Sequence, residues 1–160
     1  MNKNQKTNDK TCSFYTSDYH FEMITLPYID KKIEENKEVI ILTENNLDFT
    51  VKKLIANINL NHDRKEKILH LNWKNDDLNK FKLINKNTEN NKKMVIFIKG
   101  KENYINNINK NIEKWTENNK NIKVIDCYDL EEISEKLDEV AGNYNKVLST
   151  KGEKKLVNIK

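Results

Sequence analysis

Residues 94–127 read MVIFIKGKENYINNINKNIEKWTENNKNIKVIDC, two short apolar runs on either side of an amphipathic segment. Met94 to Lys99 and Ile122 to Cys127 are rich in β-branched residues, which is typical of strands buried on both faces. Between them, Glu102 to Asn118 repeats isoleucine at helical spacing, with Asn, Lys and Glu elsewhere. The stretch predicts a strand, a helix and a second strand, the unit from which parallel sheets are built.

The same alternation continues outward in both directions. Further strands are predicted at Cys12–Thr16, Glu38–Thr43, Lys67–Trp73 and Lys146–Ser149. Further helices are predicted at Asp18–Asn36, Leu47–Asn59, Asp76–Ile84 (followed by a polar loop, Asn85–Lys93) and Asp129–Tyr144. Pro27 predicts a kinked or two-piece first helix, because proline lacks the amide donor. Asp129 and Glu132 have the spacing of a helix capping box.

Repeated strand-helix alternation predicts an α/β fold. Right-handed crossovers would produce a three-layer, doubly wound and mostly parallel sheet of about five to six strands, with helices on both faces. Residues 1–11 are polar and low in complexity, so we expect a disordered N-terminal arm followed by a single α/β domain over residues 12–160.

The charge balance argues only weakly for nucleic acid. Lys plus Arg number 29 against 25 Asp plus Glu, a formal net charge of +4. Asn occurs 27 times and Ile 18 times, a bias that an AT-rich bacterial coding sequence would produce together with the lysines. Nucleic acid is therefore the less favoured partner.

Two cysteines are too few for a disulfide framework, and no apolar run approaches the roughly 18 residues of a membrane helix. We expect a cytoplasmic protein with free thiols and no membrane partner. The oligomeric state does not follow from these features.

Phosphate-binding loops need glycines so that backbone amides can approach the anion, and neither GxxxxGK[ST] nor GxGxxG occurs. Asp18 instead places a carboxylate at the start of the first predicted helix, where a phosphate would otherwise bind. No Cys or His spacing suits a metal ion. We therefore expect no catalytic set, no metal and no cofactor.

Candidate ligand-binding residues follow the predicted strands, because ligands of open α/β sheets bind outside the carboxyl ends of the strands. Tyr15, Ser17 and His20 lie where the first strand meets its helix. Glu44 follows the second strand and Asp129 follows the strand that ends at Cys127. The acidic members favour a ligand with hydroxyl, amine or cationic groups, or the basic segment of a partner. The alternative is that Ser17 and Asp129 only cap helices.

One segment is similar to a known family. Cys12-Ser-Phe14-Tyr15-Thr-Ser17, then Leu26-Pro27-Tyr28-Ile29 and Glu38-Val-Ile-Ile-Leu42, resembles the opening of MEDS-type sensory domains. Those domains have a Gly before the Glu and a His before the Cys, whereas Lys37 and Thr11 stand at these positions here. The resemblance implies a RecA-like sheet without the phosphate-binding loop, used as a sensory or regulatory module. It implies no catalytic residue.

Three functions are therefore considered. The first is a non-enzymatic sensory or regulatory module that binds a small molecule or a protein partner at the carboxyl edge of the sheet. The second is a magnesium-dependent nucleotide- or phosphate-handling enzyme that uses Ser17, Asp126 and Asp129. The third is a lysine-rich nucleic-acid-binding accessory protein.

Two structural predictions accompany these functions. Cys12 and Cys127 are expected to be unbonded, because a RecA-like order would place them on adjacent parallel strands about five residues apart along the strand direction. Trp115 is expected in the core, because it continues the isoleucine stripe of its helix.

Overall fold

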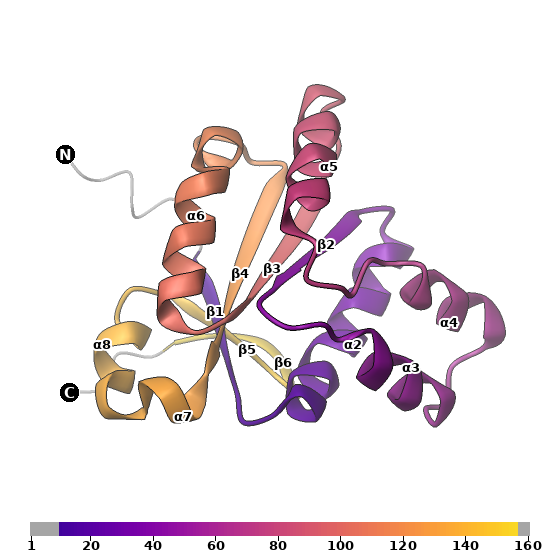
Figure 1. Cartoon of the computed structure of the whole chain (residues 1–160), viewed down its shortest axis with the longest axis horizontal. Helices are drawn as coiled ribbons and strands as arrows, with labels where there is room; N and C mark the ends of the chain where they lie inside the picture. The colour runs from indigo at the N-terminus through magenta and orange to yellow at the C-terminus, as the bar shows by residue number, and fades with distance from the viewer. Residues whose placement is uncertain (1–9, 157–160) are drawn as a thin grey trace.

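The computed structural model describes residues 10–156 and confirms the predicted α/β class (Figure 1). Six strands form one sheet in the order β2-β3-β4-β1-β5-β6. They are β1 (Thr11–Tyr15), β2 (Glu38–Thr43), β3 (Met94–Gly100), β4 (Ile122–Asp129), β5 (Lys146–Ser149) and β6 (Gly152–Lys155). Neighbouring strands pair in parallel except β5 and β6, which form an antiparallel hairpin. The order is consistent with the predicted RecA-like arrangement.

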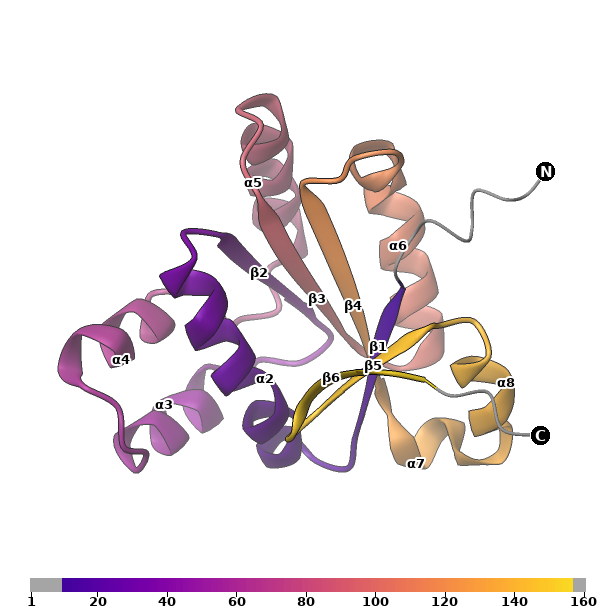
Figure 2. The same ribbon diagram turned by 180° about the vertical axis from the view of Figure 1, so that it is seen from behind.

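Helices cover both faces of the sheet, and each layer has its own apolar cluster. One face carries α2 (Asp18–Glu34), α3 (Asp48–Ala56) and α4 (His62–Leu69). Figure 2 turns this face toward the reader. The other face carries α5 (Asp77–Glu89), α6 (Glu102–Thr116), α7 (Leu130–Ile133) and α8 (Leu137–Ala141). We call these the α2 face and the α6 face.

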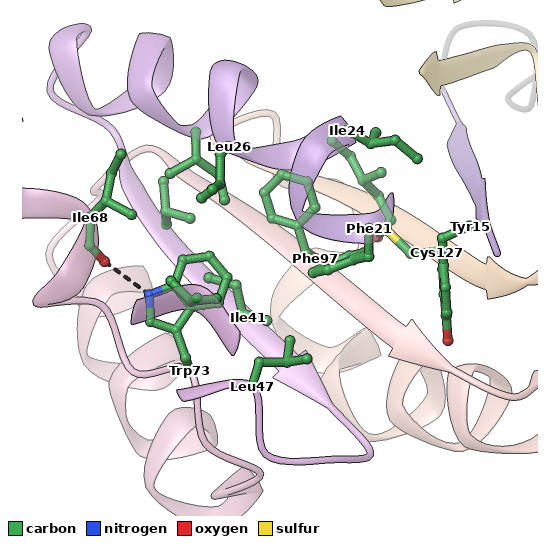
Figure 3. Close-up of a cluster of buried hydrophobic side chains, with 14 of the residues drawn as sticks. Tyr15, Phe21, Ile24, Leu26, Ile41, Leu47, Ile68, Trp73, Phe97 and Cys127 are labelled. Atoms are coloured by element: carbon green, nitrogen blue, oxygen red, sulfur yellow. Dashed lines mark hydrogen bonds between the residues drawn. The ribbon is translucent and has the colours of Figure 1, made fainter. Parts of the chain in front are cut away.

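Strand β3 shows why the sheet is buried on both sides. Its side chains alternate, so that Val95 and Phe97 join the cluster on the α2 face while Ile96 and Ile98 join the cluster on the α6 face. All seven residues of β3 are buried. Figure 3 shows Phe97 among core residues contributed by α2, β2 and the segment after α4.

The strand predicted at Lys67–Trp73 is wrong. Helix α4 continues to Leu69 and the chain then turns, leaving His70 exposed at the helix end. Trp73 is 1% exposed, and its indole Nε1 donates a 2.9 Å hydrogen bond to the carbonyl of Ile68 (Figure 3). The apolar residues that mimic a strand here fill the core from a helix end and a turn, because a short apolar run suits either structure.

Several helix predictions need correction. Helix α2 is one continuous helix that includes Pro27, so it is not in two pieces, and α5 extends through Glu89, into the predicted polar loop. The predicted helix Asp129–Tyr144 is instead α7, a short 3₁₀ turn over Ser134–Lys136, and α8. Strand β6 has no counterpart among the predicted strands.

Side chains of the segment after β4 make tertiary contacts. Tyr144 lies beyond α8, and its hydroxyl donates a 2.6 Å hydrogen bond to Asp126 in β4. Asp129 does cap α7, since its side chain accepts a hydrogen bond from the amide of Glu131. Glu132 does not complete the capping box, because its carboxylate accepts a hydrogen bond from the amide of Glu102 in α6. The Glu132 side chain therefore makes a tertiary contact with α6 instead of the local contact of a capping box.

Cys12 and Cys127 are both free and buried, as predicted, but for a different reason. Cys12 pairs in register with Asp126, and its neighbour Ser13 pairs with Cys127, so the two thiols are one residue apart along the strands rather than about five. Cys12 belongs to the cluster on the α6 face and Cys127 to the cluster on the α2 face. The sheet itself separates them.

Two further predictions concern Trp115 and the N-terminal arm. Trp115 is half-buried against the cluster on the α6 face, and its indole Nε1 donates a 2.8 Å hydrogen bond to Asn85. It is thus a boundary residue rather than a core residue. Residues 1–9 of the predicted N-terminal arm lie outside the described residues, while Thr11 already belongs to β1. No helix within residues 10–156 is long and apolar enough to cross a membrane.

Candidate functional site at the carboxyl edge of the sheet

The carboxyl ends of the parallel strands β1 and β4 lie side by side, and the connections that leave them pass to opposite faces of the sheet. From β1 the chain passes into α2, which packs on one face of the sheet, and from β4 it passes into α7, which packs on the other. In open α/β sheets this topological switch point is the preferred ligand position, because the two departing loops leave a gap between them. The predicted site residues lie at this edge.

Tyr15 is the last residue of β1 and the centre of the site. Its ring is 6% exposed and packs edge-on against Phe21, with 5.7 Å between ring centroids. Figure 3 shows its hydroxyl directed away from the other labelled core residues. Burial raises the pKa of this hydroxyl, and the carboxylates of Asp129, Asp18 and Glu44 raise it further. The structure thus brings Tyr15, Glu44 and Asp129 into one electrostatic environment and adds Asp18.

Lys99 projects from β3 beside Tyr15 and is 2% exposed. Its Nζ lies 2.9 Å from Asp18 Oδ1 and donates a 3.0 Å hydrogen bond to Asn45 Oδ1. Asn45 Nδ2 in turn donates to Asp18 Oδ2 at 2.9 Å. The same Nζ lies 4.5 Å from the centroid of the Tyr15 ring. The network neutralises the buried ammonium group with the chain's own carboxylate.

Glu22 lies one turn after Asp18 on α2 and is completely buried. Its Oε2 accepts a 2.5 Å hydrogen bond from the Thr50 hydroxyl, while Oε1 has no hydrogen-bond partner. Burial is the main cause that raises the pKa of Glu22 to about 7, with Asp18 adding to the effect and Thr50 and Lys99 opposing it. Near neutral pH this carboxyl is therefore partly protonated.

Ser17 and His20 serve the local structure. Ser17 is the N-cap of α2, and its Oγ accepts a 3.1 Å hydrogen bond from the amide of His20. His20 Nδ1 accepts from the amide of Thr16 at 2.9 Å, which places the proton of the neutral ring on Nε2. These contacts agree with the capping role that was the alternative for Ser17.

Glu44 and Asp129 also make backbone contacts. A Glu44 carboxylate oxygen accepts a 2.8 Å hydrogen bond from the amide of Lys101, just before α6, and Asp129 accepts from the amide of Glu131. Gly100 permits the Glu44 contact, because a Cβ at that position would lie 2.6 Å from the Glu44 oxygen. With Glu132 on the amide of Glu102, the start of α6 is occupied by the chain's own carboxylates. This leaves a poor position for a phosphate.

Asp126, the residue of the magnesium alternative, belongs to a different environment. It lies on the α6 face, where Tyr144 donates to one carboxylate oxygen at 2.6 Å and Asn109 donates to the other at 3.0 Å. Burial is the main cause that raises its pKa. No cluster of three or more His, Cys, Asp or Glu side chains suited to a metal ion is found within residues 10–156. Ser17, Asp126 and Asp129 therefore do not converge.

Sequence reasoning did not select Lys99, Asp18 or Glu22 as site residues. Lys99 did carry a signal, because a lysine interrupts an apolar strand run at its carboxyl end. Glu22 carried none, since a glutamate on a predicted amphipathic helix is ordinarily exposed. Two hollows of the described surface lie away from this edge, one at the amino edge of the sheet and one between α2 and α4.

Comparisons of the chain with protein-family models, with curated proteins and with solved structures each found no match. The function must therefore be argued from the geometry of the chain itself.

Proposed function

We propose that this chain is a non-enzymatic sensory or regulatory module that binds an amine- or guanidinium-bearing group at the carboxyl edge of its sheet, between β1 and β4. The group would belong to a small molecule or to a basic segment of a protein partner. The observation that carries the proposal is that Tyr15 and Asp129 end two neighbouring strands in register, at an edge where the carboxylates of Asp129, Asp18 and Glu44 all raise the pKa of the buried Tyr15 hydroxyl.

A cation fits this edge better than an anion does. The ammonium group of Lys99 is already engaged by Asp18, so it is not available to a phosphate. The amides that begin α6 are engaged by Glu44 and Glu132. A cationic group would gain two exposed or half-exposed carboxylates, Glu44 and Asp129. The resemblance to sensory domains that lack a phosphate loop supports the same reading.

The test is a binding screen by thermal shift and calorimetry. The probes are spermidine, arginine amide, a lysine-rich decapeptide, and ATP with and without magnesium. We expect stabilisation by at least one cationic probe and no stabilisation by ATP that requires magnesium. Spermidine or arginine amide binding alone would identify a small molecule, whereas preference for the peptide would identify a protein segment. Stabilisation by ATP that depends on magnesium would overturn the proposal in favour of the enzyme.

A matched pair of variants locates the binding. Glu44→Gln with Asp129→Asn removes two charges but keeps an acceptor oxygen for each backbone amide. Glu113→Gln with Glu117→Gln removes the same charge from exposed positions at the end of α6. We expect the first pair to weaken binding about tenfold and the second to leave it nearly unchanged. Equal effects would show general attraction to an acidic surface instead.

A further inference from the structure

At the amino edge of the sheet, opposite the proposed site, lysine side chains line a hollow of about 230 Å³. Met94 and Val95, at the start of β3, and Asn121, just before β4, also line it. The five lysines, which define what we call the lysine hollow, are Lys32, Lys37, Lys93, Lys120 and Lys123. Five lysines therefore line one small concavity: one from α2, one from each of three turns and one from β4.

The same turn follows three of the helices whose ends lie at this edge. Helices α2, α5 and α6 are each followed by an asparagine with positive φ, namely Asn36 (63°), Asn91 (56°) and Asn118 (58°). Asparagine tolerates this left-handed conformation, which ends a helix and reverses the chain. A lysine follows each asparagine within two residues, just before a strand.

Backbone hydrogen bonds hold the three turns side by side. The amide of Glu38 donates to the carbonyl of Lys93 at 2.9 Å, and the amide of Met94 donates to the carbonyl of Asn121 at 2.8 Å. Because β2, β3 and β4 are neighbours in the sheet, the ladder extends into the turns that carry the lysines. The lysines are thus positioned by the sheet and not by a long mobile loop.

Carboxylates only partly balance the charge. Glu35 pairs with Lys32 at 3.3 Å and with Lys37 at 3.4 Å, and Glu153 of β6 pairs with Lys123 at 2.5 Å. Within the described part of the chain, Lys93 and Lys120 form no ion pair. Helix carboxyl ends favour nearby cations, which accounts for single lysines after single helices. It does not account for five that line one concavity.

We propose that the lysine hollow binds a compact anion that carries two or more phosphate groups. Several ammonium groups at fixed positions suit an anion of multiple charge, because each lysine acts as a point charge on a separate phosphate oxygen. The hollow is small and concave, which fits a short phosphate chain better than the extended backbone of a nucleic acid. The phosphate chain would come from inorganic polyphosphate or from a phosphorylated metabolite.

The first experiment measures the affinity of the full chain for inorganic tripolyphosphate by calorimetry at about 50 and 200 mM salt. Lys93→Gln with Lys120→Gln removes the two unpaired lysines, and Lys82→Gln with Lys110→Gln removes the same charge from exposed positions on α5 and α6. We expect the hollow pair to lose affinity about tenfold or more and the control pair less than twofold. Equal losses, or no binding by the unaltered chain at the lower salt, would overturn the proposal.

A second set of arms separates the sources. Orthophosphate should bind at least tenfold more weakly than tripolyphosphate, while an adenosine triphosphate that equals tripolyphosphate would point to a phosphorylated metabolite. Single-stranded DNA that displaces tripolyphosphate and binds more tightly would overturn the proposal in favour of nucleic acid. Circular dichroism checks that the double variant Lys93→Gln with Lys120→Gln is folded. If it is not, the single variant Lys37→Gln is measured in its place. The variant Glu44→Gln with Asp129→Asn should bind tripolyphosphate unchanged, so that this proposal and the proposed function fail separately.

Discussion

Lys99 and Glu22 are two ionisable side chains buried near the start of α2, and their surroundings treat them differently. Lys99 has a carboxylate and an amide oxygen within 3.0 Å, so its charge is compensated. Glu22 has one hydroxyl donor and one oxygen without a partner. A buried carboxyl in that position is more stable when protonated, because ionisation would leave an unsolvated charge.

Stability should therefore depend on pH through Glu22. Its pKa is raised from 4.5 to about 7 in the folded chain, so the folded state binds more protons than the unfolded state between these values. The free energy of unfolding should fall as pH rises from about 4.5 to about 7, by about 1 to 3 kcal/mol from this group. Glu22→Gln removes that dependence, because Gln cannot ionise and keeps an acceptor for Thr50.

Urea unfolding of the unaltered chain and of Glu22→Gln at pH 5, 6, 7 and 8 measures this effect. Asp126, whose pKa burial also raises, contributes a slope of the same sign to both proteins, so the difference between them isolates Glu22. We expect the variant to gain stability relative to the unaltered chain as pH rises. Parallel pH profiles would show that Glu22 is solvated.

At the scale of elements, the two tryptophans show how a helix and a turn divide the burial of large side chains. Trp73 follows α4 and is 1% exposed, with its indole nitrogen satisfied by a backbone carbonyl of that helix. Trp115 lies near the end of α6, 6.3 Å from the Phe81 ring of α5 between centroids, and is half-buried. The helical stripe predicts the direction of Trp115 but not its depth.

Truncation of the two side chains should rank accordingly. Trp73→Ala should cost about 3 to 5 kcal/mol, because it opens a cavity between α4, β2 and α2 and removes a buried hydrogen bond. Trp115→Ala should cost about 1 to 2 kcal/mol, since solvent can fill the space that it leaves. Urea midpoints measured on both variants test the ranking. A larger loss for Trp115→Ala would mean that α6 carries more of the core than its exposure indicates.

For the whole molecule, the sheet has a buried centre and a less protected end. Strands β3 and β4 are covered on both faces, while β6 pairs on one side only and is largely exposed. Glu153 ties this end to the centre, because its carboxylate contacts Thr11 of β1 at 2.8 Å and Lys123 of β4 at 2.5 Å. The hairpin depends on a single side chain for these two contacts.

Hydrogen exchange should follow this gradient. Amides of β3 and β4 should exchange at the rate set by global unfolding, and amides of β5 and β6 should exchange faster through local opening. Glu153→Gln weakens the tie by about 1 kcal/mol and should speed exchange in the hairpin about fivefold, with β3 unchanged. Uniform acceleration throughout the sheet would show that β6 opens only with the whole domain.

Local pattern was sufficient wherever an element packs with its own periodicity. Strands β2, β3 and β4 and helices α3 and α6 follow directly from runs of Ile and Val or from isoleucine at helical spacing, because burial of that pattern requires that structure. The absence of a phosphate loop and the α/β class were equally readable from the residues. The carboxyl edge also followed from strand-helix alternation, and Tyr15 and Asp129 end neighbouring strands there.

Tertiary structure alone decided the features that depend on distant partners. The segment before Trp73 is a helix end and turn, because Ile68 and Trp73 fill the core from that structure. In the interrupted helix after Asp129, Glu132 bonds to the amide of Glu102 in α6 rather than within its own turn. The Lys99-Asp18-Asn45 network joins three segments, and the lysine hollow joins α2, three turns and β4. The sequence alone does not show which distant charged residues will be neighbours, because the order of the strands in the sheet decides their positions.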